Sequence, residues 1–186
     1  MRWKRRRIFC SFSAPLGATD IAIYHSLAHG IRHHPDSRGE LVAHSLRGPT
    51  YAALFLLVPN VAMHGRWLWV LVVLLAFDAA ISIWDFSIER SSRQFFGGLP
   101  TGEYVLHILI AMLFGALVAA VFFQAGSWAA LPTRLAYRPA PVPAPLRALL
   151  AIMAALVLLS GVMDAAAAYR LRGQPRRTNL TPRRAT

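Results

Sequence analysis

The sequence has almost no cysteine and few acidic residues. Cys10 is the single cysteine among 186 residues, so no disulfide can form within the chain. Asp and Glu number 8 against 20 Lys and Arg, which gives a formal net charge of +12. The chain also lacks a phosphate-binding loop, a nucleophile elbow and a zinc-finger pattern, so the chemistry of those motifs finds no support in it.

Apolar residues, in contrast, are abundant and gathered in blocks. They make up 56% of the chain, with a mean hydropathy of +0.44, whereas soluble domains are about 45–50% apolar. A helix needs roughly 20 apolar residues to cross a hydrocarbon core. The sequence therefore predicts an all-α integral membrane protein, a four-transmembrane-helix bundle. The expected spans are at about 44–64, 66–88, 103–124 and 146–169.

The chain divides into three expected regions. These are a basic cytoplasmic arm with an amphipathic interfacial helix (1–48), the four-helix transmembrane domain (49–169) and a basic disordered cytoplasmic tail (170–186). The interfacial helix is expected from about Asp20 to His33, because Pro35 stops it. Ser37 and Glu40 then have capping-box spacing, which predicts that the first span begins nearby.

The connections between the spans have different compositions. His64, Gly65 and Arg66 predict a tight turn between spans one and two. Gly97, Gly98 and Pro100 predict a loop before span three. The proline-rich stretch 125–145 predicts an extended strap before span four.

The basic residues predict the orientation of the bundle. Of the 20 Lys and Arg residues, four fall on the side opposite the termini and sixteen on the side of the termini. Basic residues gather on the cytoplasmic side of membrane proteins, so both termini are expected in the cytoplasm, in a bacterial inner membrane. The charge is thus attributed to topology and not to nucleic-acid binding. Anionic lipid headgroups are the expected partners of the basic ends, notably Arg5, Arg6, Arg7, Arg176 and Arg177.

Acidic residues lie inside the predicted spans, where they are rare and mark functional or packing sites. Asp78, Asp85 and Glu89 are spaced by seven and four residues and form one stripe on span two, together with Ser82. Asp164 lies in the inner half of span four. A polar stripe on a spanning helix must face other helices or water. The sequence therefore predicts a polar pocket at the cytoplasmic end of the bundle.

Histidines and carboxylates at that depth are candidate metal ligands. The candidates are His25, His29, His44, Asp85, Glu89, Glu103 and His107. Neutral imidazoles and carboxylates suit iron or another transition metal, for example with two histidines and one carboxylate. The simpler interpretation is ion pairing of the acids with Arg90, Arg93 or the basic tail. A less favoured alternative is haem b between His44 and His107, one from each of two spans.

One spacing resembles a known family. His25 and His29 match a His-x-x-x-His box of integral-membrane di-iron hydroxylases and desaturases, but the further His-His boxes of that family are missing, so its site is not carried over. Glu103 and His107 likewise lack the second Glu and His pair of di-iron helix bundles.

Two classes of function remain open. The first is a metal- or haem-bearing redox protein with its site at the inner face. The second is a non-catalytic accessory subunit, in which the polar residues fix helix packing and the basic ends contact other membrane subunits. Small residues such as Gly115 and Gly161 permit close helix contact in either class. Whether the chain is an enzyme is left open by its sequence.

Overall fold

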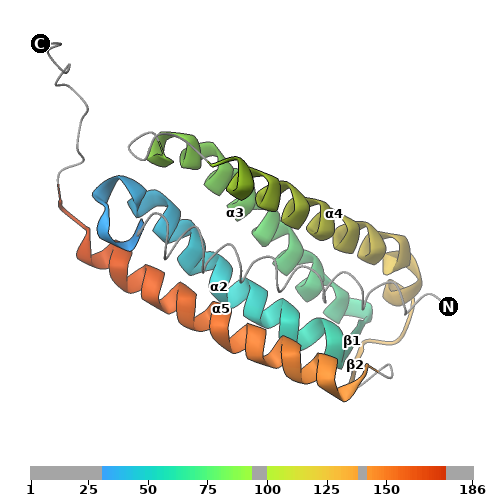
Figure 1. Ribbon diagram of the computed structural model, residues 1–186. Helices are drawn as coiled ribbons and strands as arrows, with labels where there is room; N and C mark the ends of the chain where they lie inside the picture. The colour runs from blue at the N-terminus through green and yellow to red at the C-terminus, as the bar shows by residue number, and fades with distance from the viewer. Residues whose placement is uncertain (1–30, 94–99, 138–141, 175–186) are drawn as a thin grey trace, which may run out of the picture.

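The computed structural model of the protein describes residues 31–93, 100–137 and 142–174, with side chains 90–93 excepted. Four long helices dominate this part of the chain (Figure 1). The elements in chain order are η2 (Ile31–His33), η3 (Pro35–Ser37), α2 (Arg38–Asn60), β1 (Val61–His64), η4 (Gly65–Trp67), α3 (Leu68–Arg93), α4 (Thr101–Ala129), β2 (Arg134–Tyr137) and α5 (Ala144–Arg170).

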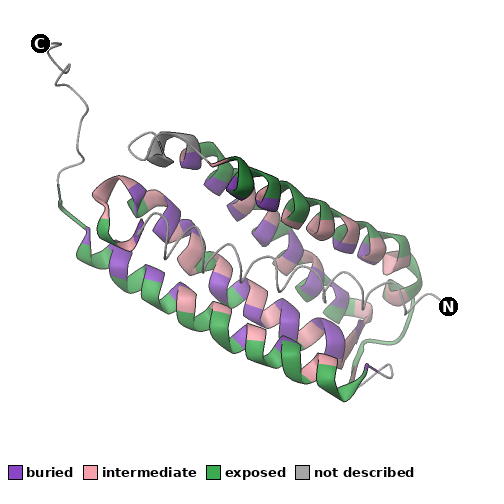
Figure 2. Cartoon of the chain, in the orientation of Figure 1, coloured by how far each residue is buried: buried purple, intermediate pink, exposed green. Residues whose placement is uncertain are grey.

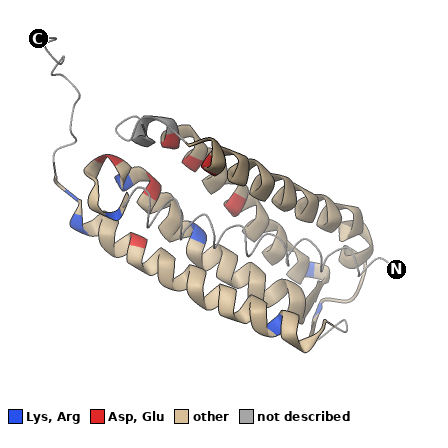
Figure 3. Cartoon of the chain, viewed as in Figure 1, with Lys and Arg blue, Asp and Glu red and all other residues tan. Residues whose placement is uncertain are grey.

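The long helices lie side by side in the order α5, α2, α3 and α4 (Figure 1). The most extensive interface joins α2 to α5, and a smaller one joins α2 to α3. Helix α4 packs mainly against α3 and the turn around β1 and η4. We call the end of the bundle where α2 and α4 begin and where α3 and α5 end the acidic end, because the acidic residues gather toward it (Figure 3).

Two glycines explain why α2 and α5 approach so closely. A Cβ atom added to Gly48 would lie 2.8 Å from the carbonyl oxygen of Val157 and 3.0 Å from the Cα atom of Gly161. A Cβ atom added to Gly161 would lie 3.1 Å from the Cα atom of Gly48. Backbone therefore meets backbone at this crossing, as is common between membrane helices. Gly115 on α4 differs, because a Cβ atom there would meet nothing within 4 Å.

A short β-ribbon closes the other end of the bundle. Strands β1 and β2 pair antiparallel, with Val61 opposite Tyr137 and His64 opposite Arg134. Gly65 follows β1 with a φ of 58°, which favours glycine, and an added Cβ atom would collide with Thr133. The ribbon thus joins the end of α2 to the segment that leads from α4 to α5.

The core of the bundle is apolar, and so is much of its outer surface. Leu54, Leu71, Leu75 and Leu150 are buried in one cluster between the helices. The outward faces, green in Figure 2, carry many large exposed side chains, and Phe123 is 83% exposed. All four long helices are long and apolar enough to cross a membrane.

The structure confirms the four-helix prediction and changes several boundaries. Helix α2 begins at Arg38, before the expected start of the first span at about 44, and it ends at Asn60 because the next four residues form β1. Part of the expected strap, Arg134–Tyr137, is a paired strand, which the all-α prediction omitted. The capping box was wrong, since Ser37 makes no side-chain hydrogen bond to the start of α2. The expected interfacial helix lies almost wholly outside the described residues.

Candidate functional site

The acidic stripe of α3 faces the inside of the bundle. Asp78, Asp85 and Glu89 are 0%, 4% and 7% exposed. Their spacing of seven and four residues places them on one face of the helix, as the sequence predicted. Buried carboxylates require cations, protons or hydrogen-bond donors nearby. The partners of the stripe therefore determine what this region can do.

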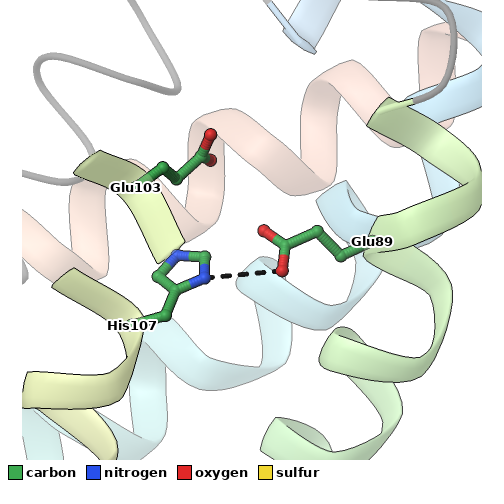
Figure 4. Close-up of side chains that lie close together, drawn as sticks. All are labelled: Glu89, Glu103 and His107. Carbon is green, nitrogen blue, oxygen red and sulfur yellow. Dashed lines mark ion pairs between the residues drawn. The ribbon is translucent and has the colours of Figure 1, made fainter. Parts of the chain in front are cut away.

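The last member of the stripe meets two residues from the start of α4 (Figure 4). Single donor atoms of Glu89, Glu103 and His107 all lie within 4.8 Å of one another. The Nδ1 atom of His107 is 3.4 Å from the Oε2 atom of Glu89. Glu103 is fully buried, and Glu103 and His107 project from one face of α4 because they are four residues apart. We call these three residues the Glu89 cluster.

The Glu89 cluster contains the donor types that a transition metal uses. Carboxylate oxygens and imidazole nitrogens bind Zn²⁺ at about 2.0–2.2 Å, so two donors of one ion are at most about 4.4 Å apart. The donor atoms of the Glu89 cluster lie within 4.8 Å of one another, which is slightly above this limit. Small side-chain movements would bring them within it. Two carboxylates also balance the charge of a divalent ion. The cluster offers one histidine and two carboxylates as ligands. The sequence suggested two histidines and one carboxylate as an example of a ligand set.

The phenyl ring of Phe86 packs beside this cluster. Its centroid lies 5.6 Å from that of the His107 imidazole, with the two rings tilted by 38°. Phe86 is itself 42% exposed on the outer surface of α3. The imidazole is therefore screened on one side by an apolar ring, which fixes its orientation and lowers the local polarity.

A second polar group lies deeper between α2 and α3. The Nη1 atom of Arg47 donates to Asp85 Oδ2 at 3.1 Å, and its Nη2 atom donates to Ser82 Oγ at 2.7 Å. The Nε2 atom of His44 lies 3.5 Å from the same Asp85 oxygen. The guanidinium also lies over the ring of Tyr51, 5.9 Å from its centroid. Asp85 is thus paired with α2.

Asp78 is the deepest acid of the stripe. The nearest cation is Arg47, whose Nε atom lies 3.8 Å from Asp78 Oδ1. This distance is too long for a hydrogen bond. Among the residues that the structure describes, neither carboxyl oxygen of Asp78 has a hydrogen-bond partner. Asp78 is therefore buried beside a guanidinium that is directed mainly toward Asp85 and Ser82.

A third polar group joins η2 to α5. The Nε atom of Arg32 donates to Asp164 Oδ1 at 2.6 Å, and its Nη2 atom donates to Ser160 Oγ at 3.0 Å. Ser160 and Asp164 are four residues apart on α5 and share a face. The Nε atom of Arg38 donates to the carbonyl of Ala168, near the end of α5. These contacts attach the segment before α2 to the last turns of α5.

The structure divides the predicted ligand set into separate groups. Glu89, Glu103 and His107 form one cluster, whereas His44 and Asp85 lie together around Arg47. The other candidates fall outside the described residues: His25 and His29, and the lipid-binding Arg5, Arg6, Arg7, Arg176 and Arg177. The side chains of Arg90 and Arg93, the expected ion-pair partners, also fall outside them.

Arg47 is the functional residue that sequence reasoning missed. It was counted only as a charge on the inner side of the membrane. The sequence did contain a signal for this role. Arg47 follows His44 by three residues inside the expected first span, so both side chains share one helix face. A buried arginine on a spanning helix requires an acidic partner, and the stripe on span two supplies one.

Comparisons with known proteins give no relative. No protein-family model matches the chain, and no curated protein or solved structure matches it significantly.

Proposed function

We propose that this chain is an integral membrane protein that binds one divalent transition metal through Glu89, Glu103 and His107. The single observation that carries the proposal is the meeting of their donor atoms within 4.8 Å in a buried position. The residues come from two helices, so the site depends on the folded bundle. A divalent ion would neutralise two carboxylates that are otherwise unfavourable together at low polarity.

The proposed location is the cytoplasmic end of a bundle in a bacterial inner membrane. Four helices long and apolar enough to span a membrane support insertion. The excess of basic residues on the side of the termini supports the orientation. The basic termini would then lie against anionic lipid headgroups.

Iron or another redox-active transition metal would give this site a redox function. Imidazole and carboxylate ligands bind iron, manganese and zinc, and of these only zinc cannot change its oxidation state. The apolar outer surface and the nearby Phe86 ring suit a lipid-soluble reaction partner. In this chain, Glu103 and His107 would fix the ion to α4, and Glu89 would join it to α3.

Metal analysis of the purified protein tests the proposal. The chain in lipid nanodiscs is dialysed against Fe²⁺, Mn²⁺ or Zn²⁺ and then assayed for bound metal by mass spectrometry. We expect one ion per chain. E103Q and H107Q should weaken binding at least about tenfold, the lower end of the loss caused by changes around a metal site. H64Q is the matched control, because His64 lies in the β-ribbon at the other end of the bundle.

Two outcomes of this experiment would overturn the metal proposal. One is protein that retains no metal above the level of the buffer. The other is equal metal binding by E103Q, H107Q and the unchanged chain. A Soret absorption band would instead indicate haem b.

The second candidate function is that of an accessory membrane subunit without a cofactor. Its supporting observation is the surface of α4, where Phe122 and Phe123 are 76% and 83% exposed. A Cβ atom added to Gly115 on the same helix would meet no described residue within 4 Å. A partner subunit could pack against this surface. Absence of metal and haem, combined with co-purification of a stoichiometric membrane partner, would favour this function.

A further inference from the structure

Asp78 occupies an unusual position for an acid. Its side chain is 0% exposed and sits in the middle of α3, eleven residues before Glu89. That separation is about 16 Å along a helix axis. Neither of its oxygens accepts a hydrogen bond from any residue within the described ranges. An ionised carboxylate in such a place is strongly unfavourable unless it is paired and hydrogen-bonded.

The charges around Asp78 do not balance if both acids of this group are ionised. Helix α2 contributes Arg47, His44 and Tyr51, and α3 contributes Asp78 and Asp85. With the histidine and tyrosine neutral, one guanidinium would face two carboxylates. A single proton makes the group neutral, which low polarity favours.

The other titratable groups on the neighbouring helices do not correct this imbalance. On α5, Asp164 is paired with Arg32 at 2.6 Å. On α4, Glu103 and His107 lie with Glu89 near the acidic end, and no other residue of this helix beyond His107 is acidic or basic. Among the described residues, the excess negative charge therefore belongs to the group formed by Asp78, Asp85 and Arg47.

Geometry indicates which acid holds the proton. Asp85 accepts a charge-assisted hydrogen bond from Arg47 at 3.1 Å, which favours its ionised form. Asp78 accepts none, and its closest cation is 3.8 Å away. The proton therefore belongs on Asp78.

We propose that Asp78, with Arg47 and Asp85, forms a buried proton-binding site between α2 and α3. The ligand of this site is a proton. It enters from the acidic end, because the titratable side chains of His44 and Asp85 lie between Asp78 and that end. Beyond Asp78 and Tyr51, the described parts of α2 and α3 carry no titratable side chain before His64 and Arg66. When the proton leaves, the Asp78 carboxylate competes with Asp85 for the guanidinium of Arg47.

Infrared spectroscopy of the unmodified chain tests the proposal without a mutation. The protein is produced with ¹³C in its aspartate carboxyl groups and placed in lipid nanodiscs at neutral pH. A protonated carboxylic acid has a carbonyl band separate from the carboxylate bands, and the label shifts this band only if the acid is an aspartate. We expect a band that shifts with the label. A labelled sample without one overturns the proposal.

Two variants then assign the band to one residue. D78N should abolish it, and the matched variant D164N, which changes a buried aspartate paired with Arg32, should keep it. Retention of the band in D78N would overturn the assignment. Circular dichroism checks that both variants keep the helical content of the unchanged chain. The measurement does not involve the Glu89 cluster, so its outcome is independent of metal binding.

Discussion

Arg47 makes it possible for α3 to keep acids in the interface with α2. Its guanidinium reaches Asp85 and Ser82 through two separate nitrogens and lies 3.8 Å from Asp78 through a third. The fork geometry of arginine permits this, whereas a lysine ammonium could not span the same acceptors. The arginine is also largely buried, with a side chain that is 18% exposed.

Removal of Arg47 should strongly destabilise the bundle. R47A leaves Asp85 buried without its cation, and breaking a buried ion pair in this way costs about 3–5 kcal/mol. S82A removes one hydrogen bond from the same guanidinium and should cost only about 1 kcal/mol. The free energy of unfolding in mixed detergent micelles measures both. Equal effects of the two substitutions would contradict the role given to the ion pair.

The pair of Arg32 and Asp164 should show direct energetic coupling. The two side chains are 2.6 Å apart, and the Asp164 side chain is 6% exposed. A double-mutant cycle with R32Q and D164N should therefore give a coupling energy of about 0.5–3 kcal/mol. The matched cycle pairs R32Q with S82A, whose partner is Arg47. Additive effects in the first cycle would show that this contact contributes nothing to stability.

At this scale, the sequence predicted which side chains are buried better than it predicted their partners. The spacing of Asp78, Asp85 and Glu89 fixes their common face, and they do face the bundle interior. The sequence placed Asp85 in one set of candidate ligands with Glu103 and His107, but the structure pairs it with Arg47. Helical periodicity gives the direction of a side chain within one helix and does not specify which helix lies opposite.

At the scale of elements, the crossing of α2 and α5 depends on two glycines. G48A should destabilise the bundle, because the new methyl group would lie 2.8 Å from the backbone of α5. Overpacking of this kind costs about 1–3 kcal/mol. G161A should behave similarly, since its methyl group would lie 3.1 Å from the Cα atom of Gly48.

G115A is the control for these substitutions. The added methyl group on α4 meets no atom within 4 Å, and alanine favours a helix over glycine by about 1 kcal/mol. Its stability should therefore be unchanged or slightly higher in the same unfolding assay. If G115A lost as much stability as G48A, the effect of G48A could not be assigned to the crossing of α2 and α5. Contacts of α4 outside this chain would then contribute to the measured stability.

The elements themselves were largely predictable because hydrophobic length is a strong constraint. Each expected span corresponds to one long helix, and the turn at Gly65 lies where the sequence placed it. The β-ribbon was not predictable, because Val61–His64 continues the apolar block of the first span. Only the pairing with Arg134–Tyr137, between 70 and 76 residues away, makes this segment a strand.

At the scale of the whole molecule, polarity is distributed unevenly along the bundle. The acids of the described residues lie toward the acidic end, apart from the deeper Asp78 (Figure 3). The half near the β-ribbon contains no acid among the described residues, and its core is apolar and includes Leu54, Leu71 and Leu150. Both proposed sites therefore lie nearer one end of the bundle, and the proposed orientation in the membrane determines which compartment would supply the metal and the proton.

Reporter fusions test this orientation. Four spans place both termini on one side, and the sixteen-to-four distribution of the 20 basic residues favours the cytoplasm. A fusion at Thr186 should therefore report a cytoplasmic position, whereas a fusion after Ala130, where α4 ends, should report the opposite side. A fusion at Pro100, between α3 and α4, is the control and should match Thr186. If Ala130 and Thr186 report the same side, the four-span topology is wrong and the acidic end does not have a single compartment.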